Sequence, residues 1–256
     1  TNSIDEIPIA SPHAMSMLDS AWSLLALLTT DARTSYPWPL CWGNALWGYV
    51  AFKQDASKLA PASQPSAMFG IFGSFVLYTM PANFCANLFC FVRTPSALTN
   101  TTIIPVHLAC CFLIGWVPGC AALLGSAIPF AVIDSLGVLD NATTGMNYME
   151  EALALSGSPV LAMLAGMAVN LGGGLLRHFA MRGYVEGAAS FDERLRAAVL
   201  YSFATCALYY WAALEPCAGD DKCLRATQLY EILPWVAVAR NLAPTVMQAL
   251  RKEKTA

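Results

Sequence analysis

The most informative stretch of the sequence is Met163-Leu-Ala-Gly-Met-Ala-Val-Asn-Leu-Gly-Gly-Gly-Leu-Leu-Arg-His-Phe-Ala-Met-Arg-Gly183. It holds three consecutive glycines, Gly172 to Gly174, inside an otherwise apolar segment. Each glycine costs a helix roughly 1 kcal/mol relative to alanine in a soluble host. A run of three therefore needs a structural reason. Either the glycines let helices pack closely, or they break the helix and expose backbone carbonyls to a water-filled cavity.

Polar side chains accompany these glycines, because Asn170, Arg177 and His178 lie within two helical turns of them. Polar and charged groups beside interrupted helix are the usual lining of an ion path. The stretch Met68-Phe-Gly-Ile-Phe-Gly-Ser-Phe-Val-Leu-Tyr-Thr-Met-Pro-Ala-Asn83 has a parallel pattern, in which glycines precede polar residues and a proline. The predicted pore residues are Gly70, Gly73, Ser74, Tyr78, Asn83, Asn170, Gly172, Gly173, Gly174, Arg177 and His178.

The composition is that of a membrane protein. Of 256 residues, 12% are charged and 57% are hydrophobic, and the mean hydropathy is +0.51. No charged residue occurs in the 34 positions between Lys58 and Arg93, or in the 40 between Arg93 and Asp134. A helix of about 20 apolar residues crosses a bilayer. These features exclude a disordered chain and a nucleic-acid-binding domain. The alternative is a very hydrophobic soluble helical bundle.

The apolar segments predict an all-α integral membrane protein with seven transmembrane helices. The glycine-bearing second and fifth spans are three spans apart, which predicts inverted three-helix repeats followed by a seventh helix. Residues 1–36 are predicted to form an N-terminal extension with a short interfacial helix at 17–28. Residues 37–250 would be the seven-helix membrane domain and residues 251–256 a basic C-terminal tail. The expected spans are 37–52, 66–91, 101–117, 121–139, 159–181, 195–214 and 229–250.

Basic residues predict the orientation of these spans. Nine Lys and Arg residues fall on the side of the 1–2 loop, the 5–6 connection and the C-terminus, and four fall on the other side. By the positive-inside rule the nine mark the cytosol-like face. The N-terminus is then expected on the lumenal or outer side. The same count places the sequons at Asn100 and Asn141, and acidic residues such as Asp140, on that outer side.

The sequence contains no catalytic constellation. It has three His and nine Cys residues, but no His-x-x-x-His or Cys-x-x-Cys pair, no P-loop and no Gly-x-Ser-x-Gly motif. Neither an enzyme, a metal site nor a cofactor is therefore expected. Cys217 and Cys223 flank an acidic loop and are either a disulfide in an oxidising lumen or two free thiols. Asp134, a carboxylate well inside a span, is either functional or close to the membrane surface.

On these features the chain resembles the trimeric intracellular cation (TRIC) channel family, as a divergent member. The resemblance covers about residues 37–250. Phe72-Gly-Ser-Phe-Val-Leu77 is similar to the second-span signature of that family, and Asn170-Leu-Gly-Gly-Gly-Leu-Leu-Arg177 is similar to its glycine-rich fifth-span motif. The resemblance implies three assembled protomers, each with its own pore bent by these glycines. It also implies potassium flux that balances charge during calcium release from internal stores.

The fourth span departs from the animal members of that family. They carry a Lys-Glu-Val motif whose Lys helps to hold a phosphoinositide. Here the neighbourhood reads Phe130-Ala-Val-Ile-Asp-Ser-Leu136, and no Lys or Arg occurs from 94 to 176. Phosphoinositide binding by that route is therefore not expected.

Three hypotheses of function stay open. The first is a TRIC-like potassium channel of an intracellular organelle membrane, a homotrimer surrounded by lipids, with the pore at glycine-kinked helices 2 and 5. The second is a non-conducting accessory or structural subunit of a large organelle-membrane complex, such as a photosystem or respiratory assembly. Bound lipids or pigments would then be its cofactors, and His107 would either ligate a chlorophyll magnesium or be a satisfied polar group. The third, a small-solute transporter with alternating access, is allowed by the inverted repeat.

Overall fold

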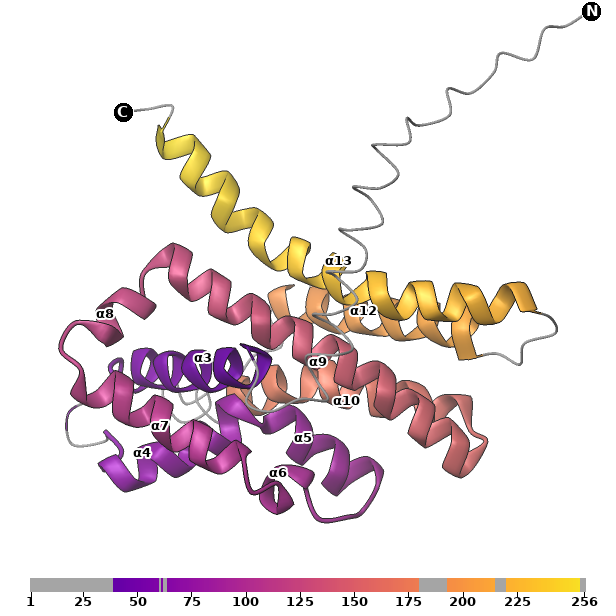
Figure 1. Cartoon of the computed structure of the whole chain (residues 1–256), viewed down its shortest axis with the longest axis horizontal. Helices are drawn as coiled ribbons and strands as arrows, with labels where there is room; N and C mark the ends of the chain where they lie inside the picture. The colour runs from indigo at the N-terminus through magenta and orange to yellow at the C-terminus, as the bar shows by residue number, and fades with distance from the viewer. Residues whose placement is uncertain (1–38, 60, 62–63, 180–192, 215–219, 254–256) are drawn as a thin grey trace, which may run out of the picture.

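The computed structural model describes residues 39–59, 61, 64–179, 193–214 and 220–253. Helices and the turns between them make up these residues, and no strand occurs among them (Figure 1). The predicted N-terminal extension, with its interfacial helix, lies outside the described residues. Elements labelled η are π-helical turns. In chain order the elements are α3 (Pro39–Ala56), α4 (Ala67–Ser74), η3 (Phe75–Thr79), α5 (Pro81–Cys85), η4 (Ala86–Cys90), α6 (Ser96–Thr99), α7 (Ile103–Trp116), α8 (Cys120–Leu124), α9 (Ala127–Ser156), α10 (Pro159–Arg177), α12 (Glu193–Tyr209), η6 (Tyr210–Leu214) and α13 (Asp220–Glu253).

Each predicted span contains helix, although the lengths differ from those expected. By length and composition alone, 2 helices among the described residues are able to cross a membrane, Pro159–Arg177 and Leu195–Leu214. A broken helix, Ala67–Thr79 with Pro81–Cys90, raises this number to 3 if it counts as one span. The apolar helix α7 is shorter. The count of seven spans and the inverted repeat stay predictions.

The second predicted span is bent by 72°. The bend lies at Met80, which leaves the helical region (φ −124°, ψ 22°), and Pro81 then begins the next helix. A proline has no N–H to continue the helix but fits the first turn of a new one. The kink predicted here is therefore present. Its cause is Pro81, because Gly70 and Gly73 both lie within regular helix α4.

The fifth predicted span is not broken at its glycines, so the expected kink there is wrong. Helix α10 runs without interruption from Pro159 to Arg177. An added Cβ at Gly172 would lie 2.7 Å from Cys85 Cβ, and one at Gly173 would lie 2.7 Å from Pro81 Cγ. The glycines thus allow the bent helix to pack directly on α10, which was the alternative explanation.

The fourth helix is longer than the predicted 121–139. Short α8 precedes it, and α9 then continues for 30 residues to Ser156. Pro129 is tolerated because it lies in the first turn, where no backbone N–H is needed. The polar residues after 139, which suggested a loop, belong to the helix. Asp140 and the sequon residue Asn141 are therefore in the middle of α9, and their expected place in an outer loop is wrong.

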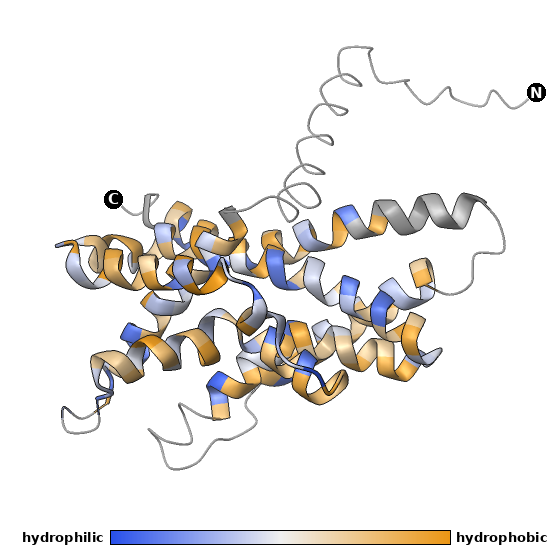
Figure 2. Ribbon diagram, turned by 60° about the horizontal axis from the view of Figure 1, so that its bottom comes forward, coloured by the Kyte–Doolittle hydropathy of each residue, from blue (hydrophilic) through white to orange (hydrophobic). Residues whose placement is uncertain are grey.

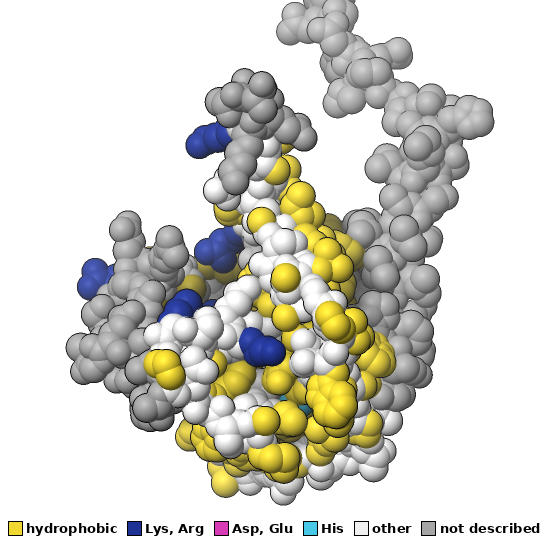
Figure 3. All heavy atoms as spheres, turned by 90° about the vertical axis from the view of Figure 1, so that its left-hand side faces the viewer, with side chains coloured by type: hydrophobic (Ala, Val, Ile, Leu, Met, Phe, Trp, Pro, Cys, Tyr) yellow, Lys and Arg dark blue, Asp and Glu magenta, His cyan; other side chains and the backbone are white. Residues whose placement is uncertain are grey.

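The ends of the helices alternate between two sides, as the orientation argument requires. Figure 1 places the α3–α4 connection, α8 and the C-terminal end of α13 towards the same end of the molecule, and the α9–α10 turn at the opposite end. Figure 3 views the first end and shows Lys and Arg side chains, with no Asp or Glu side chain visible on that face among the described residues. Helix α13 continues to Glu253, so the predicted tail begins inside a helix.

Large apolar side chains cover much of the outer surface. Met68, Phe89, Trp116 and Trp211 are each more than two-thirds exposed, and apolar positions colour most of the helices in Figure 2. Soluble proteins rarely expose apolar patches of this extent, so this surface fits contact with lipid. The largest buried cluster joins α9, α10, α12, η6 and α13 around Met149, Ala162, Cys206 and Tyr209.

Candidate functional site

A charged and aromatic cluster lies where the bent helix meets α3, α9 and α10. The guanidinium carbon of Arg177, in the last turn of α10, is 5.2 Å from the ring centroid of Trp47 and 5.7 Å from that of Tyr78. Tyr78 is buried, and its hydroxyl donates to Asp55 Oδ2 at 2.9 Å. The Asp134 carboxylate on α9 is close enough to interact electrostatically with Arg177. These five residues are called the arginine cluster.

The positive charge of Arg177 is held mainly by ring faces. Among the described residues, no carboxylate lies within 4 Å of its guanidinium. Cation–π contacts of this kind stabilise a cation by roughly 0.5–2 kcal/mol, and arginine stays charged inside a protein. The cluster therefore holds a permanent cation by ring contacts rather than by an ion pair.

Two carboxylates on α9 add negative charge to this interior. Asn241 Nδ2 donates to Asp134 Oδ2 at 2.8 Å, and Asn44 Nδ2 donates to Asp140 Oδ2 at 2.9 Å. An amide satisfies the hydrogen bonding of a carboxylate without neutralising its charge. Because fixed negative charge in a low-dielectric interior raises the local concentration of cations, this region favours cations over anions.

Ser74, a predicted pore residue, belongs to a separate buried network. Its Oγ lies 3.1 Å from His107 Nε2, and Thr79 Oγ1 lies 3.1 Å from His107 Nδ1. Nε2 is also 3.1 Å from the Ile71 carbonyl oxygen. Both ring nitrogens thus have protein partners, as expected for a satisfied polar group. The network ties α7 to the turn just before the bend.

Replacing His107 with leucine is expected to lower the free energy of unfolding by about 2 kcal/mol, because the buried hydroxyls of Ser74 and Thr79 would lose a partner. The unfolding temperature in detergent measures this effect. Ser126→Ala is the control, because its hydroxyl bonds to the Leu123 carbonyl at an exposed position. Equal unfolding temperatures for the two variants would contradict the structural role of His107.

Asn83 lies just after the bend, in α5. Its Oδ1 accepts from the backbone N–H of Ala97 at 3.1 Å, and its Nδ2 donates to Ser96 Oγ at 2.7 Å. It therefore anchors the connection to α6. These contacts do not involve the arginine cluster, so they do not support the predicted place of Asn83 in the pore lining.

An ion pair fixes the same connection to the end of α9. Both terminal nitrogens of Arg93 donate to the Glu151 carboxylate, and Arg93 Nε donates to Asn87 Oδ1 at 2.5 Å. Hydrogen bonding to Glu151 raises the pKa of Arg93 above its usual value. The Arg93 guanidinium also lies 4.5 Å from the ring centroid of Phe91. Nothing in the sequence pairs these residues, which are 58 positions apart.

The remaining predicted residues are dispersed. Asn170 faces a cavity between α9, α10, α12 and α13 rather than the arginine cluster. His178 packs on Phe179, with ring centroids 5.3 Å apart, and Gly174 has open space beside it. Cys217 lies outside the described residues, as does the side chain of Cys223, so the proposed disulfide stays a prediction. The structure adds Trp47 and Asp55 to the site.

Comparisons with known proteins extend this description. No known protein-family profile matches the chain, and no curated protein sequence does. Two solved structures match its fold. One is described as "Structural basis for activity of TRIC counter-ion channels in calcium release"; it is 15% identical, covers 89% of this chain and 99% of the other, and has a TM-score of 0.60. The chain has the fold of the TRIC channels.

The second structure is of a trimeric intracellular cation channel from C. elegans in the absence of Ca2+. It is 12% identical, covers 88% of this chain and 96% of the other, and has a TM-score of 0.61. The TRIC fold confirms the predicted resemblance and the all-α integral membrane class. The low identities agree with a divergent member. Both structures are described as channels.

Proposed function

We propose that the protein is a TRIC-like channel for monovalent cations, potassium in particular, in an intracellular organelle membrane. Cations would pass through the arginine cluster of each protomer. The observation that carries this proposal is the charge of that interior: α9 carries two carboxylates, Asp134 and Asp140, whereas the cluster holds one guanidinium, Arg177, inside an apolar bundle with the TRIC fold. The third carboxylate, Asp55, is paired with Lys58. Such a region attracts cations and repels anions.

In this proposal Arg177 opposes the passage of cations as long as it rests on the rings of Trp47 and Tyr78. Two unit charges 5 Å apart repel by about 3 kcal/mol at an effective dielectric constant of 20. Movement of Arg177 away from the rings would remove that barrier. Asp55 keeps the Tyr78 ring in place by accepting its hydroxyl. The bend at Pro81 provides room for polar groups between helices that are otherwise apolar.

Reconstitution of the full chain into planar bilayers tests the proposal. Under a potassium chloride gradient, we expect currents whose reversal potential lies close to the equilibrium potential of potassium. A reversal potential near that of chloride, or no current above that of protein-free bilayers, would contradict it. Replacing potassium by sodium in the same bilayers measures the selectivity between the two cations.

A non-conducting subunit of a larger complex is the second candidate, and the exposed aromatics Phe89, Trp116 and Trp211 favour it. The native mass of the detergent-solubilised protein separates the two. A homotrimer has three times 27.5 kDa, or about 82 kDa, and supports the channel. A much larger particle with other chains supports the subunit. The N-terminus is proposed to lie on the lumenal side in either case.

A further inference from the structure

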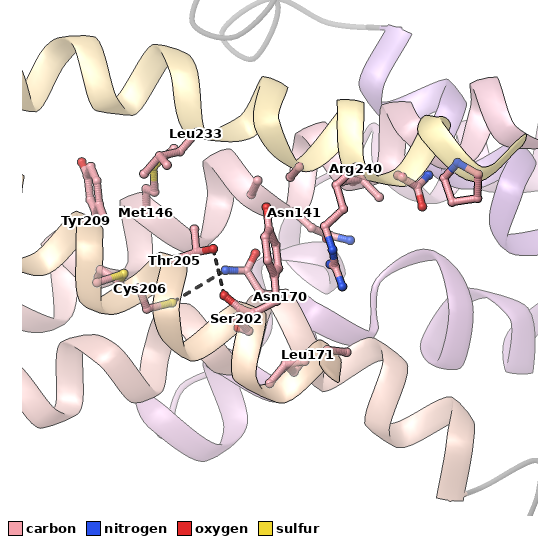
Figure 4. Close-up of a pocket in the computed structure, with 18 residues that line it drawn as sticks. Asn141, Met146, Asn170, Leu171, Ser202, Thr205, Cys206, Tyr209, Leu233 and Arg240 are labelled. Carbon is pink, nitrogen blue, oxygen red and sulfur yellow. Dashed lines mark hydrogen bonds between the residues drawn. The ribbon is translucent and has the colours of Figure 1, made fainter. Parts of the chain in front are cut away.

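A cavity of about 500 Å³ lies between α9, α10, α12 and α13 (Figure 4). None of the five residues of the arginine cluster lines it. Its volume is in the range of about 300–1,000 Å³ typical of small-molecule sites. It is therefore a second polar feature of the bundle. It adjoins the arginine cluster at Asn241, which lines the cavity and donates to Asp134.

The two ends of the cavity differ in chemistry. Figure 4 shows Arg240 towards one end, Asn170 and Ser202 near the middle, and Met146, Leu233 and Tyr209 towards the other end. A molecule that fills this cavity therefore meets a basic, polar environment at one end and a largely apolar one at the other. This is the environment that an amphiphile requires.

Arg240 supplies the charge at the polar end. Its side chain points from α13 into the cavity, and its guanidinium carbon lies 4.0 Å from the ring centroid of Tyr201. Among the described residues no carboxylate forms an ion pair with it. Arg240 is exposed and stacks on the Tyr201 ring, and a charge without an opposite charge on a helix of the membrane region is costly. An anion in the cavity would be its charged partner.

Ser202 provides an independent indication of a polar ligand. It lines the cavity and is 3% exposed, yet its hydroxyl makes no hydrogen bond with the described residues. The Cys206 thiol is near enough to interact with it but is only a weak acceptor. The amide of Asn170 likewise has only a weak contact, with Cys206 Sγ at 3.8 Å. Buried polar groups normally find full hydrogen-bond partners.

We propose that this cavity binds a single-chain amphiphile with an anionic headgroup, either a carboxylate or a phosphate. The headgroup pairs with Arg240 and accepts hydrogen bonds from Ser202 and Asn170. The alkyl chain lies against Met146 and Leu233. This site is distinct from the arginine cluster, so the proposal does not depend on whether the protein conducts.

Native mass spectrometry of the full-length protein in a neutral detergent tests the proposal with three probes of one chain length: dodecanoate, dodecyl phosphate and dodecanol. We expect one or both anions to bind at least tenfold more tightly than dodecanol. The stronger of the two anions identifies the headgroup. Equal binding of dodecanol, or tighter binding of inorganic phosphate than of either anion, would overturn the proposal.

Variants locate the binding in this cavity. Arg240→Gln is expected to weaken anion binding at least tenfold, and Arg240→Lys to weaken it less. Arg251→Gln is the matched control, because this arginine lies on the same helix but does not line the cavity. Ala142→Phe, which fills the cavity, is expected to abolish binding of anion and alcohol alike. Anion binding unchanged in Arg240→Gln, or reduced equally in Arg251→Gln, would overturn the assignment.

Discussion

An Arg177→Gln variant is expected to pass potassium about ten times faster than the wild-type protein. The substitution removes the positive charge that faces Trp47 and Tyr78 but leaves the carboxylates of the cluster in place. Removing a repulsion of about 3 kcal/mol would allow a larger increase, and the nearby carboxylates already offset part of it. The measurement is the single-channel conductance in planar bilayers.

Three further variants serve as controls for this measurement. Arg177→Lys keeps the charge and should conduct like the wild type. Asp134→Asn removes a negative charge from the same interior and should lower the conductance. Arg93→Gln changes an arginine in the connection between η4 and α6 and should leave the conductance unchanged. If Arg177→Gln and Arg93→Gln both conduct like the wild type, cations do not pass through the arginine cluster.

Replacing Gly173 with alanine is expected to lower the free energy of unfolding by about 1–3 kcal/mol and to reduce conduction. The added Cβ would lie 2.7 Å from Cγ of Pro81. The proline ring sits in the bend and is rigid, so the bent helix itself has to move away from α10. Forcing an extra methyl group into a packed interface typically costs this amount. Thermal unfolding in detergent and bilayer currents measure the two effects.

The neighbouring glycine provides a control of the same size. Gly174→Ala adds the same methyl group one residue later on α10, where no atom lies within 4 Å. It should leave the conductance unchanged and raise stability by up to about 1 kcal/mol, because alanine favours helix over glycine. If Gly173→Ala is as stable as Gly174→Ala, the glycines do not serve the packing of the bent helix.

The sequence predicted the class of fold because charge-free segments of sufficient length identify membrane helices without any tertiary information. The sequence did not correctly place residues whose hydrogen-bonding partners are distant in the chain. Asp140 was expected in an outer loop because a carboxylate ends an apolar segment, but the amide of Asn44, 96 positions away, bonds to it inside the bundle. For the same reason the sequence did not predict the full length of α9, which continues past Asp140 to Ser156.

The candidate site was predicted in part for the same reason. Arg177 and Tyr78 were found through the glycines beside them, and the structure brings both into one cluster. Trp47 and Asp55 lie in a different helix, so no local pattern connects them with Arg177. Ser74 and Asn83 were grouped with the pore by proximity in sequence alone. The 72° bend at Met80 lies between Tyr78 and Asn83, whereas Ser74 lies before the bend but contacts His107 on α7.

The length of α9 has a consequence for the surrounding bilayer. At 1.5 Å per residue, its 30 residues extend about 45 Å, whereas the hydrocarbon region is about 30 Å thick. A helix of this length either tilts in the bilayer or extends beyond the hydrocarbon region, where its polar residues Glu150 and Glu151 would reach the interface. Because Asp134 and Asp140 are carried by α9, a change of tilt moves both carboxylates relative to Arg177. A bilayer whose thickness alters the tilt of α9 would therefore also alter the charge balance of the interior.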